Sequence, residues 1–144
     1  MIKNERQYRI TKAQAERFER AVSEVSAQPS RGVPRALHKA QLDGLKSQLN
    51  DLRGEMSEYE ALRSGKRRSL ALESIEELPK TLIQARIAAG LSQDELAAKL
   101  GLKPQQIQRY EATNYQAASL QRVNEVVRVL GLKLRRGAEL RLVS

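Results

Sequence analysis

The stretch GLSQDELAAKLGLKPQQIQRYE, residues 90–111, decides the fold that we expect for the C-terminal half of the chain. It predicts two short helices that are joined by a tight turn. Ser92 is suited to cap the first helix, and Glu95 three residues later completes a capping box. Gly101 is suited to end that helix in a left-handed conformation. Pro104 stands at the first position of the second helix, where an N–H would have no partner anyway.

The two predicted helices present their apolar residues on one side. Leu96 and Leu100 share a face of the first helix, and Ile107 and Tyr110 point back to the core from the second. The small side chain of Ala97 fits a point where the helices cross closely. A short helix, a glycine-containing turn and a second short helix form a helix-turn-helix. The residues that this arrangement leaves outward on the second helix are Gln105, Gln106, Gln108 and Arg109.

Residues 79–132 resemble the Cro/CI-type (XRE family) DNA-binding domain, the five-helix fold of the lambda-like phage repressors. The resemblance covers a little over a third of the chain and extends from residues 90–111 into the tail SLQRVNEVVRVLGL, residues 119–132. It implies a protein that binds double-stranded DNA and needs no cofactor. The residues that stand where the family has its usual ones are Gln93, Ala97, Gly101, Ile107 and Glu111.

The resemblance also implies which side chains read the bases. Gln105, Gln106 and Arg109 would face base edges in the major groove, where glutamine pairs with adenine and arginine with guanine. Gln108 is a secondary candidate, because it faces either the DNA or the side of the helix. Pro104 departs from the family pattern, since many relatives carry a contacting polar residue at that position.

A second set of residues would contact the phosphate backbone. These are Gln93, Lys103, Asn114 and Tyr115. Gln93 would also brace the recognition helix. The alternative is that the outward glutamines form a solvated helix face and that Arg109 makes a surface ion pair with Glu111 or a neighbour, which would contribute little. Within a helix-turn-helix on a basic domain, DNA binding is favoured.

Charge and composition agree with a polyanionic partner. The 144 residues hold 26 Lys and Arg against 17 Asp and Glu, a net charge of +9, and aromatic residues make up only 3%. Duplex DNA is favoured over single strands, which usually need aromatic stacking platforms. There is no cysteine, and His38 is the single histidine. We therefore expect no metal site, no catalytic site and no enzymatic activity.

The N-terminal part, residues 1–63, predicts a helical hairpin or coiled coil. Its first helix is expected over residues 11–27, capped by Thr11 after a short extended piece. The second is expected over residues 35–63, with a heptad seam of apolar residues. The seam consists of Leu42, Leu45, Leu49, Leu52, Met56 and Tyr59. Because the first helix is the shorter, part of the seam should contact a second chain; the alternative is an intramolecular hairpin alone.

Residues 64–78 are expected to be a linker, and Ser74 with Glu77 offers another capping box. Residues 133–144 are expected to form a short β-strand or ribbon, because leucines alternate with basic residues there. The predicted fold is therefore all-α with a C-terminal strand. No apolar run approaches the roughly 20 residues of a membrane span, so we expect a soluble cytoplasmic protein that contacts no membrane.

The predicted function is a transcriptional repressor that acts as a dimer on a palindromic operator, because one short helix reads only a few base pairs. The homodimer would form through the seam or through the C-terminal strand. The chain also resembles antitoxins of the HigA and HipB types, which implies repression of its own operon and a toxin protein as a further partner. The alternative is a protein-interaction module in which the N-terminal coiled coil is the working part.

Overall fold

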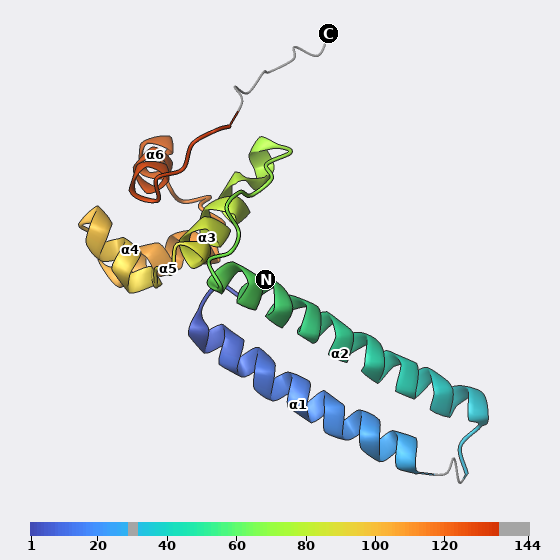
Figure 1. The fold of residues 1–144 in the computed structure, drawn as a ribbon. Helices are drawn as coiled ribbons and strands as arrows, with labels where there is room; N and C mark the ends of the chain where they lie inside the picture. Colours follow the sequence, from blue (N-terminus) through green and yellow to red (C-terminus); the bar gives the residue numbers. More distant parts are fainter. Residues whose placement is uncertain (29–31, 136–144) are drawn as a thin grey trace. The chain divides into compact units, whose positions relative to one another are not determined.

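The computed structural model describes residues 1–28 and 32–135. The chain divides into two compact units, Met1–Arg67 and Arg68–Ser144, and this division falls within the segment that we predicted to be a linker. Every regular element of the described residues is helical, as Figure 1 shows, in agreement with the all-α prediction. Within these residues, no helix is long and apolar enough to cross a lipid bilayer.

The first unit contains α1, Glu5–Ala27, which begins six residues before the predicted start. Asn4 caps the helix, because its side-chain oxygen accepts a hydrogen bond from the Gln7 N–H at 2.9 Å. Gln7 in turn accepts from the Lys3 N–H at 2.8 Å. The prediction of an N-cap at Thr11 and of an extended piece before it is therefore wrong. Thr11 lies inside the helix and is buried.

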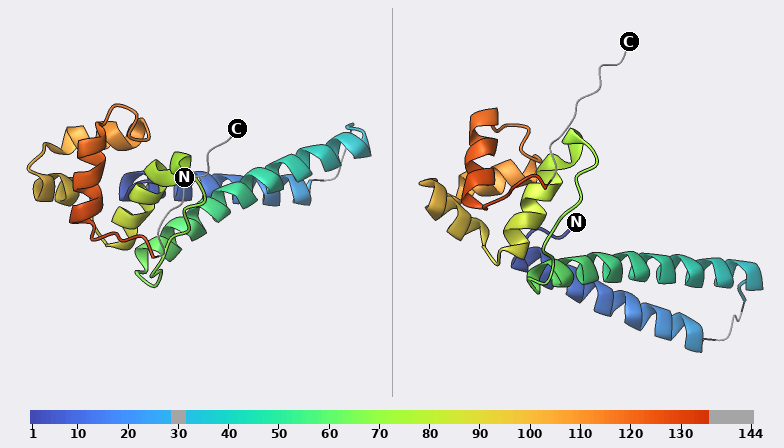
Figure 2. Two further views of the ribbon diagram at one scale, coloured as in Figure 1. Left: turned by 90° about the horizontal axis from the view of Figure 1, so that it is seen from above. Right: turned by 45° about the horizontal axis from the view of Figure 1, so that its top comes forward.

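Helix α2, Arg35–Arg63, has the predicted bounds and lies antiparallel to α1 (Figures 1 and 2). Polar contacts and a ring stack hold the two helices in register from end to end. An ion pair joins Arg63 Nη1 to Glu5 Oε2 at 2.5 Å, and the Tyr8 ring stacks on the Tyr59 ring with 5.2 Å between the centroids. At the other end, His38 Nε2 lies 3.0 Å from a backbone oxygen of α1.

The six seam residues of α2 face the interior of this hairpin. Leu49 and Tyr59 are buried, and the other four are half-buried. The longer α1 covers more of the seam than the sequence suggested, since it has 23 residues. A second chain is therefore less needed to cover the seam, and a dimer through the seam stays a prediction.

The second unit contains a 3₁₀ turn, Ile75–Glu77, followed by α3, Leu78–Ala88, α4, Gln93–Leu100, α5, Pro104–Ala112, and α6, Leu120–Val129. Its core is apolar and draws on every α-helix of the unit. The apolar side chains with no exposed surface are Leu82, Ile83, Leu96, Ala97, Ile107 and Val126, and the Glu111 carboxylate is buried as completely. Complete burial of Ala97 agrees with the predicted close crossing of α4.

The predicted start and end of α4 are confirmed. Ser92 Oγ accepts from the Glu95 N–H at 3.1 Å, and Glu95 Oε2 accepts from the Ser92 N–H at 2.7 Å. These hydrogen bonds lower the pKa of Glu95 below its ordinary value. The bond from the Ser92 N–H to the Glu95 carboxylate is therefore present at neutral pH and is lost as the pH falls through that lowered pKa, whereas the bond to Ser92 Oγ does not titrate. Gly101 ends the helix with φ of 68°, in the left-handed region.

At the edges of this unit, the predicted capping box needs correction and most of the predicted strand is not tested. Ser74 precedes the 3₁₀ turn but makes no side-chain cap; Glu77 Oε2 accepts instead from the Glu73 N–H at 3.0 Å. Residues 132–135 form no strand, and the rest of the predicted C-terminal strand, residues 136–144, lies outside the described residues.

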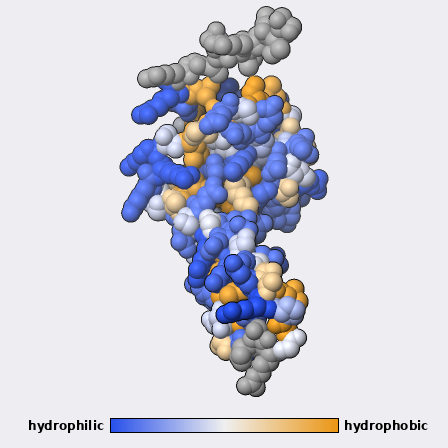
Figure 3. Space-filling view, turned by 90° about the vertical axis from the view of Figure 1, so that its right-hand side faces the viewer, coloured by the Kyte–Doolittle hydropathy of each residue, from blue (hydrophilic) through white to orange (hydrophobic). Residues whose placement is uncertain are grey.

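In the face shown in Figure 3, hydrophilic side chains predominate and apolar ones form small separate patches.

Candidate DNA-binding site

Helix α5 has one buried and one exposed face. Ile107 and Glu111, one turn apart, have no exposed surface. With about 100° between successive residues, Arg109 lies almost directly opposite them, and Gln105 lies one turn before it on the same exposed face. Gln108 is exposed as well, at the edge of that face. Arg109 and Gln105 are therefore the side chains that α5 presents most directly to a partner.

Gln106 is exposed and also serves the helix itself. Its Oε1 accepts a hydrogen bond from the Lys103 backbone N–H at 3.0 Å. Gln106 thus satisfies one of the backbone donors that a helix N-terminus leaves without an intrahelical partner. The side-chain amide is thereby oriented with its NH₂ group available as a donor, and Lys103, also exposed, stands at the same end of α5.

Glu111 anchors the far end of α5 through a buried ion pair with Arg86 of α3. Arg86 Nε donates to Glu111 Oε1 at 2.5 Å, and Nη2 donates to Oε2 at 2.8 Å. The same guanidinium donates through Nη1 to the Leu91 carbonyl at 2.7 Å. The exposed fractions of the two side chains are 3% and 0%. The alternative of a surface pair between Arg109 and Glu111 is therefore wrong.

Gln93, the first residue of α4, joins the same cluster. Its Nε2 donates to Glu111 Oε2 at 2.7 Å, and the side chain is half-buried. The hydrogen bond links the start of α4 to the end of α5, which is the bracing role that the resemblance implied. A phosphate contact through Gln93 stays a prediction.

The turn after α5 has an uncommon backbone. Asn114 and Tyr115 have φ of 48° and 57°, in the left-handed region that residues other than glycine seldom adopt. Asn114 is exposed, as a phosphate contact requires, but Tyr115 is only 5% exposed and its ring stacks on Tyr110. Burial and the nearby Glu111 carboxylate raise the pKa of Tyr115. The predicted phosphate contact through the Tyr115 side chain therefore needs correction, because the ring is a core residue.

Tyr115→Phe is expected to leave DNA affinity within about twofold and to maintain or raise the free energy of unfolding. The buried hydroxyl has no hydrogen-bond partner among the described residues, and such a group costs about 1–3 kcal/mol. Fluorescence anisotropy on a duplex and urea unfolding measure the two quantities. Asn114→Gly is the comparison variant, because glycine adopts the same left-handed backbone. It should weaken DNA binding. A tenfold loss of affinity in Tyr115→Phe with an unchanged fold would show that the Tyr115 hydroxyl contacts DNA.

Arg86 was missed by the sequence analysis. Its partner stands 25 residues further along the chain, and neither residue carries a local signal for the other. The one available hint was Arg86 among apolar neighbours in α3, since Arg is seldom fully buried unless it is paired.

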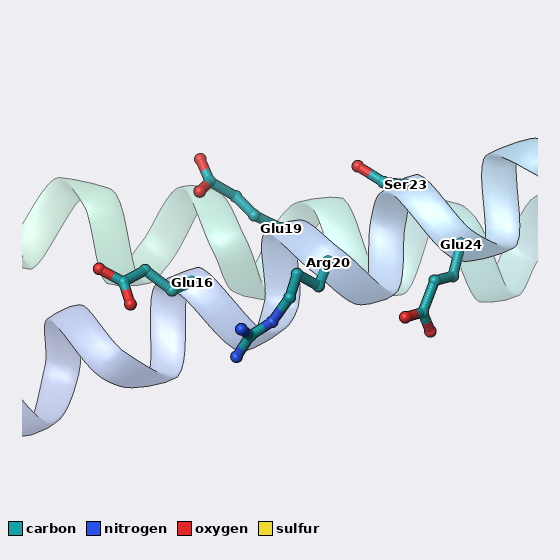
Figure 4. Close-up of a pocket in the computed structure, with 5 residues that line it drawn as sticks. All are labelled: Glu16, Glu19, Arg20, Ser23 and Glu24. Atoms are coloured by element: carbon teal, nitrogen blue, oxygen red, sulfur yellow. The ribbon is translucent and has the colours of Figure 1, made fainter.

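A second surface feature, a depression on α1, is an unsuitable site for DNA. Glu16, Glu19, Arg20, Ser23 and Glu24 line it, and Figure 4 shows their side chains spread along a single helix. Three carboxylates against one guanidinium would repel a phosphate backbone. This depression therefore does not compete with α5.

Comparison with known proteins points to the same part of the chain as the candidate site. A family model described as helix-turn-helix matches residues 82–136. This match supports a DNA-binding transcription regulator of the Cro/CI type, and the matched family is not one of enzymes. Searches of curated proteins and of solved structures found no match.

Proposed function

We propose that the chain is a sequence-specific repressor that inserts α5 into the major groove of duplex DNA. One observation carries the proposal: Gln105 and Arg109 are exposed on a short helix whose opposite face is fixed by Ile107 and Glu111. Glutamine and arginine are the side chains that form bidentate pairs with adenine and guanine. A helix held at its back in this way presents them in a fixed orientation.

The buried cluster supports the proposal because it limits the movement of α5. Gln93 of α4 and Arg86 of α3 both bind the Glu111 carboxylate, so three helices meet at one charged group. Base readout needs side chains that are held in place before contact, since ordering them on binding costs free energy. At the opposite end, Gln106 caps α5. The recognition helix is thus held to α3 and α4 at one end, and its first turn is stabilised at the other.

We further propose that two copies act together on a palindromic operator. One recognition helix reads few base pairs, and a two-fold dimer with half-sites about 34 Å apart doubles the site. Sedimentation of the free chain and of its complex with a palindromic duplex tests this arrangement. Two chains for each duplex are expected, and one chain on a full palindrome would contradict the dimer.

An antitoxin role is the finer proposal, and it rests on the resemblance to antitoxins of the HigA and HipB types. The hairpin is the candidate toxin-binding part, since Val33 and Leu37 near its tip are 42% and 59% exposed. These exposed apolar side chains equally favour the second candidate function, a protein-interaction module. Co-expression with the product of the adjacent reading frame tests the toxin. A Leu37→Glu chain should lose the complex while keeping its DNA binding.

Binding to a duplex that the wild-type chain selects from a random library is expected to weaken steeply as salt rises. Neutralisation of phosphates by Lys and Arg releases counterions, so affinity falls about 10³–10⁵-fold between 50 and 200 mM salt for six to ten phosphate contacts. Fluorescence anisotropy at four salt concentrations measures the slope. Binding that is undetectable or insensitive to salt would contradict the proposal and favour the interaction module.

A further inference from the structure

The segment after α2 carries the one run of three consecutive basic residues in the chain. These are Lys66, Arg67 and Arg68, and no acidic residue occurs in residues 61–72. All three side chains are exposed. A run of this kind concentrates positive charge at one place on the surface.

The backbone of this run is not helical. Helix α2 ends at Arg63, and Gly65 turns the chain out of it with φ of 67°. Residues 66–73 then form no regular element. The three cations therefore follow each other along an irregular chain, whereas a helix would spread them around its axis.

Nearby carboxylates do not neutralise the run. Among the described residues, none of the three cations takes part in an ion pair. The neighbouring Arg63 is bound to Glu5, and Glu77 accepts from the Glu73 backbone. The charge of the run is thus available to an external anion.

The charges of the run follow each other about as densely as the phosphates of DNA. An extended chain advances about 3.3–3.6 Å per residue, and each DNA strand carries one phosphate per 3.4 Å along the helix axis. Successive side chains of an extended chain point to opposite sides, so the long Lys and Arg side chains of the run can reach about three neighbouring phosphates on the two sides of its path. A regular, dense anionic array of this kind favours DNA over a protein with scattered carboxylates.

The run is also tethered to the helix-turn-helix. Leu78, the first residue of α3, is ten residue steps after Arg68, and this segment reaches at most about 36 Å. Once α5 has bound the DNA, binding of the run to the same duplex becomes intramolecular, and the effective concentration of the run near the phosphates is high.

We propose that residues 66–68 form a basic arm that binds the phosphates flanking the half-site contacted by α5. The proposal rests on the DNA-binding function proposed above and adds a site that the helix-turn-helix does not contain. The arm contributes affinity without sequence preference, because phosphate contacts carry no base information.

The test compares the full-length wild-type chain with the triple variant Lys66→Gln, Arg67→Gln and Arg68→Gln on one selected duplex. The slope of log K against log salt concentration is expected to become shallower by about 0.9 for each lost phosphate contact, so by about 2.7 for three. The affinity ratio between the selected and a scrambled duplex is expected to stay unchanged. Anisotropy titrations from 50 to 200 mM salt measure both quantities.

The matched control removes the same net charge from exposed cations of the hairpin, as Arg17→Gln, Lys39→Gln and Lys46→Gln. An unchanged slope in the arm variant, or an equal decrease in the control, would overturn the basic arm and leave the proposed function standing. A wild-type chain that binds no duplex would overturn the proposed function itself. The two failures are therefore distinguishable.

Discussion

Replacing both Gln105 and Arg109 with alanine is expected to abolish the preference of the chain for its selected duplex. Each bidentate contact to a base contributes about 1–3 kcal/mol of discrimination, so two contacts contribute roughly 2–6 kcal/mol. Both side chains are exposed, and the fold should therefore remain intact. Anisotropy with the selected and the scrambled duplex measures the preference, and circular dichroism measures the helix content.

The matched control is Gln121→Ala with Arg128→Ala, the same residue types on the exposed surface of α6. These changes should leave the preference within about twofold. A Gln105 and Arg109 variant that still selects the same duplex would show that α5 is not the recognition helix. Gln106→Ala is a less specific test, because it also removes the hydrogen bond that caps α5.

Glu111→Ala is expected to lower the free energy of unfolding of the helix-turn-helix unit by about 3–5 kcal/mol. It leaves the Arg86 guanidinium, 3% exposed, without its bidentate partner, and an uncompensated buried charge is strongly destabilising. It also removes the acceptor of the Gln93 side chain. Urea unfolding followed by circular dichroism and by tyrosine fluorescence measures the loss.

A more exposed ion pair among the described residues of this unit provides the control. Arg122 and Glu125 are 26% and 36% exposed, so Glu125→Ala should cost less than about 1 kcal/mol. Equal losses in the two variants would contradict the special role of the buried pair. Replacement of both partners, Arg86→Met with Glu111→Leu, should recover part of the stability, because no unpaired charge is then left in the core.

Much of the helix-turn-helix could be predicted because its signals are local. The capping box of Ser92 with Glu95, the left-handed Gly101 and the proline that opens α5 each act within one turn of the chain. The exposed face of α5 follows from the helical period alone. This is why Gln105, Gln106, Gln108 and Arg109 were predicted as outward and are all exposed.

The start of α1 shows where local signals were insufficient. Asn4 with Gln7 and Thr11 with Gln14 are both plausible capping pairs. The longer helix gains a stack of Tyr8 on Tyr59 and an ion pair of Glu5 with Arg63, which lie more than 50 residues apart in the sequence. Tertiary contacts therefore selected between two caps that the sequence alone could not distinguish.

The sequence by itself determined which helices form and which face of α5 is polar, because both follow from spacing and capping within a few residues. Only the tertiary structure decided what holds α5 in place. Glu111 binds Arg86 and Gln93 from two other helices, and Tyr115 turns into the core. Packing decides which cation lies beside a buried carboxylate. This partner therefore depends on contacts between segments that are distant in the sequence.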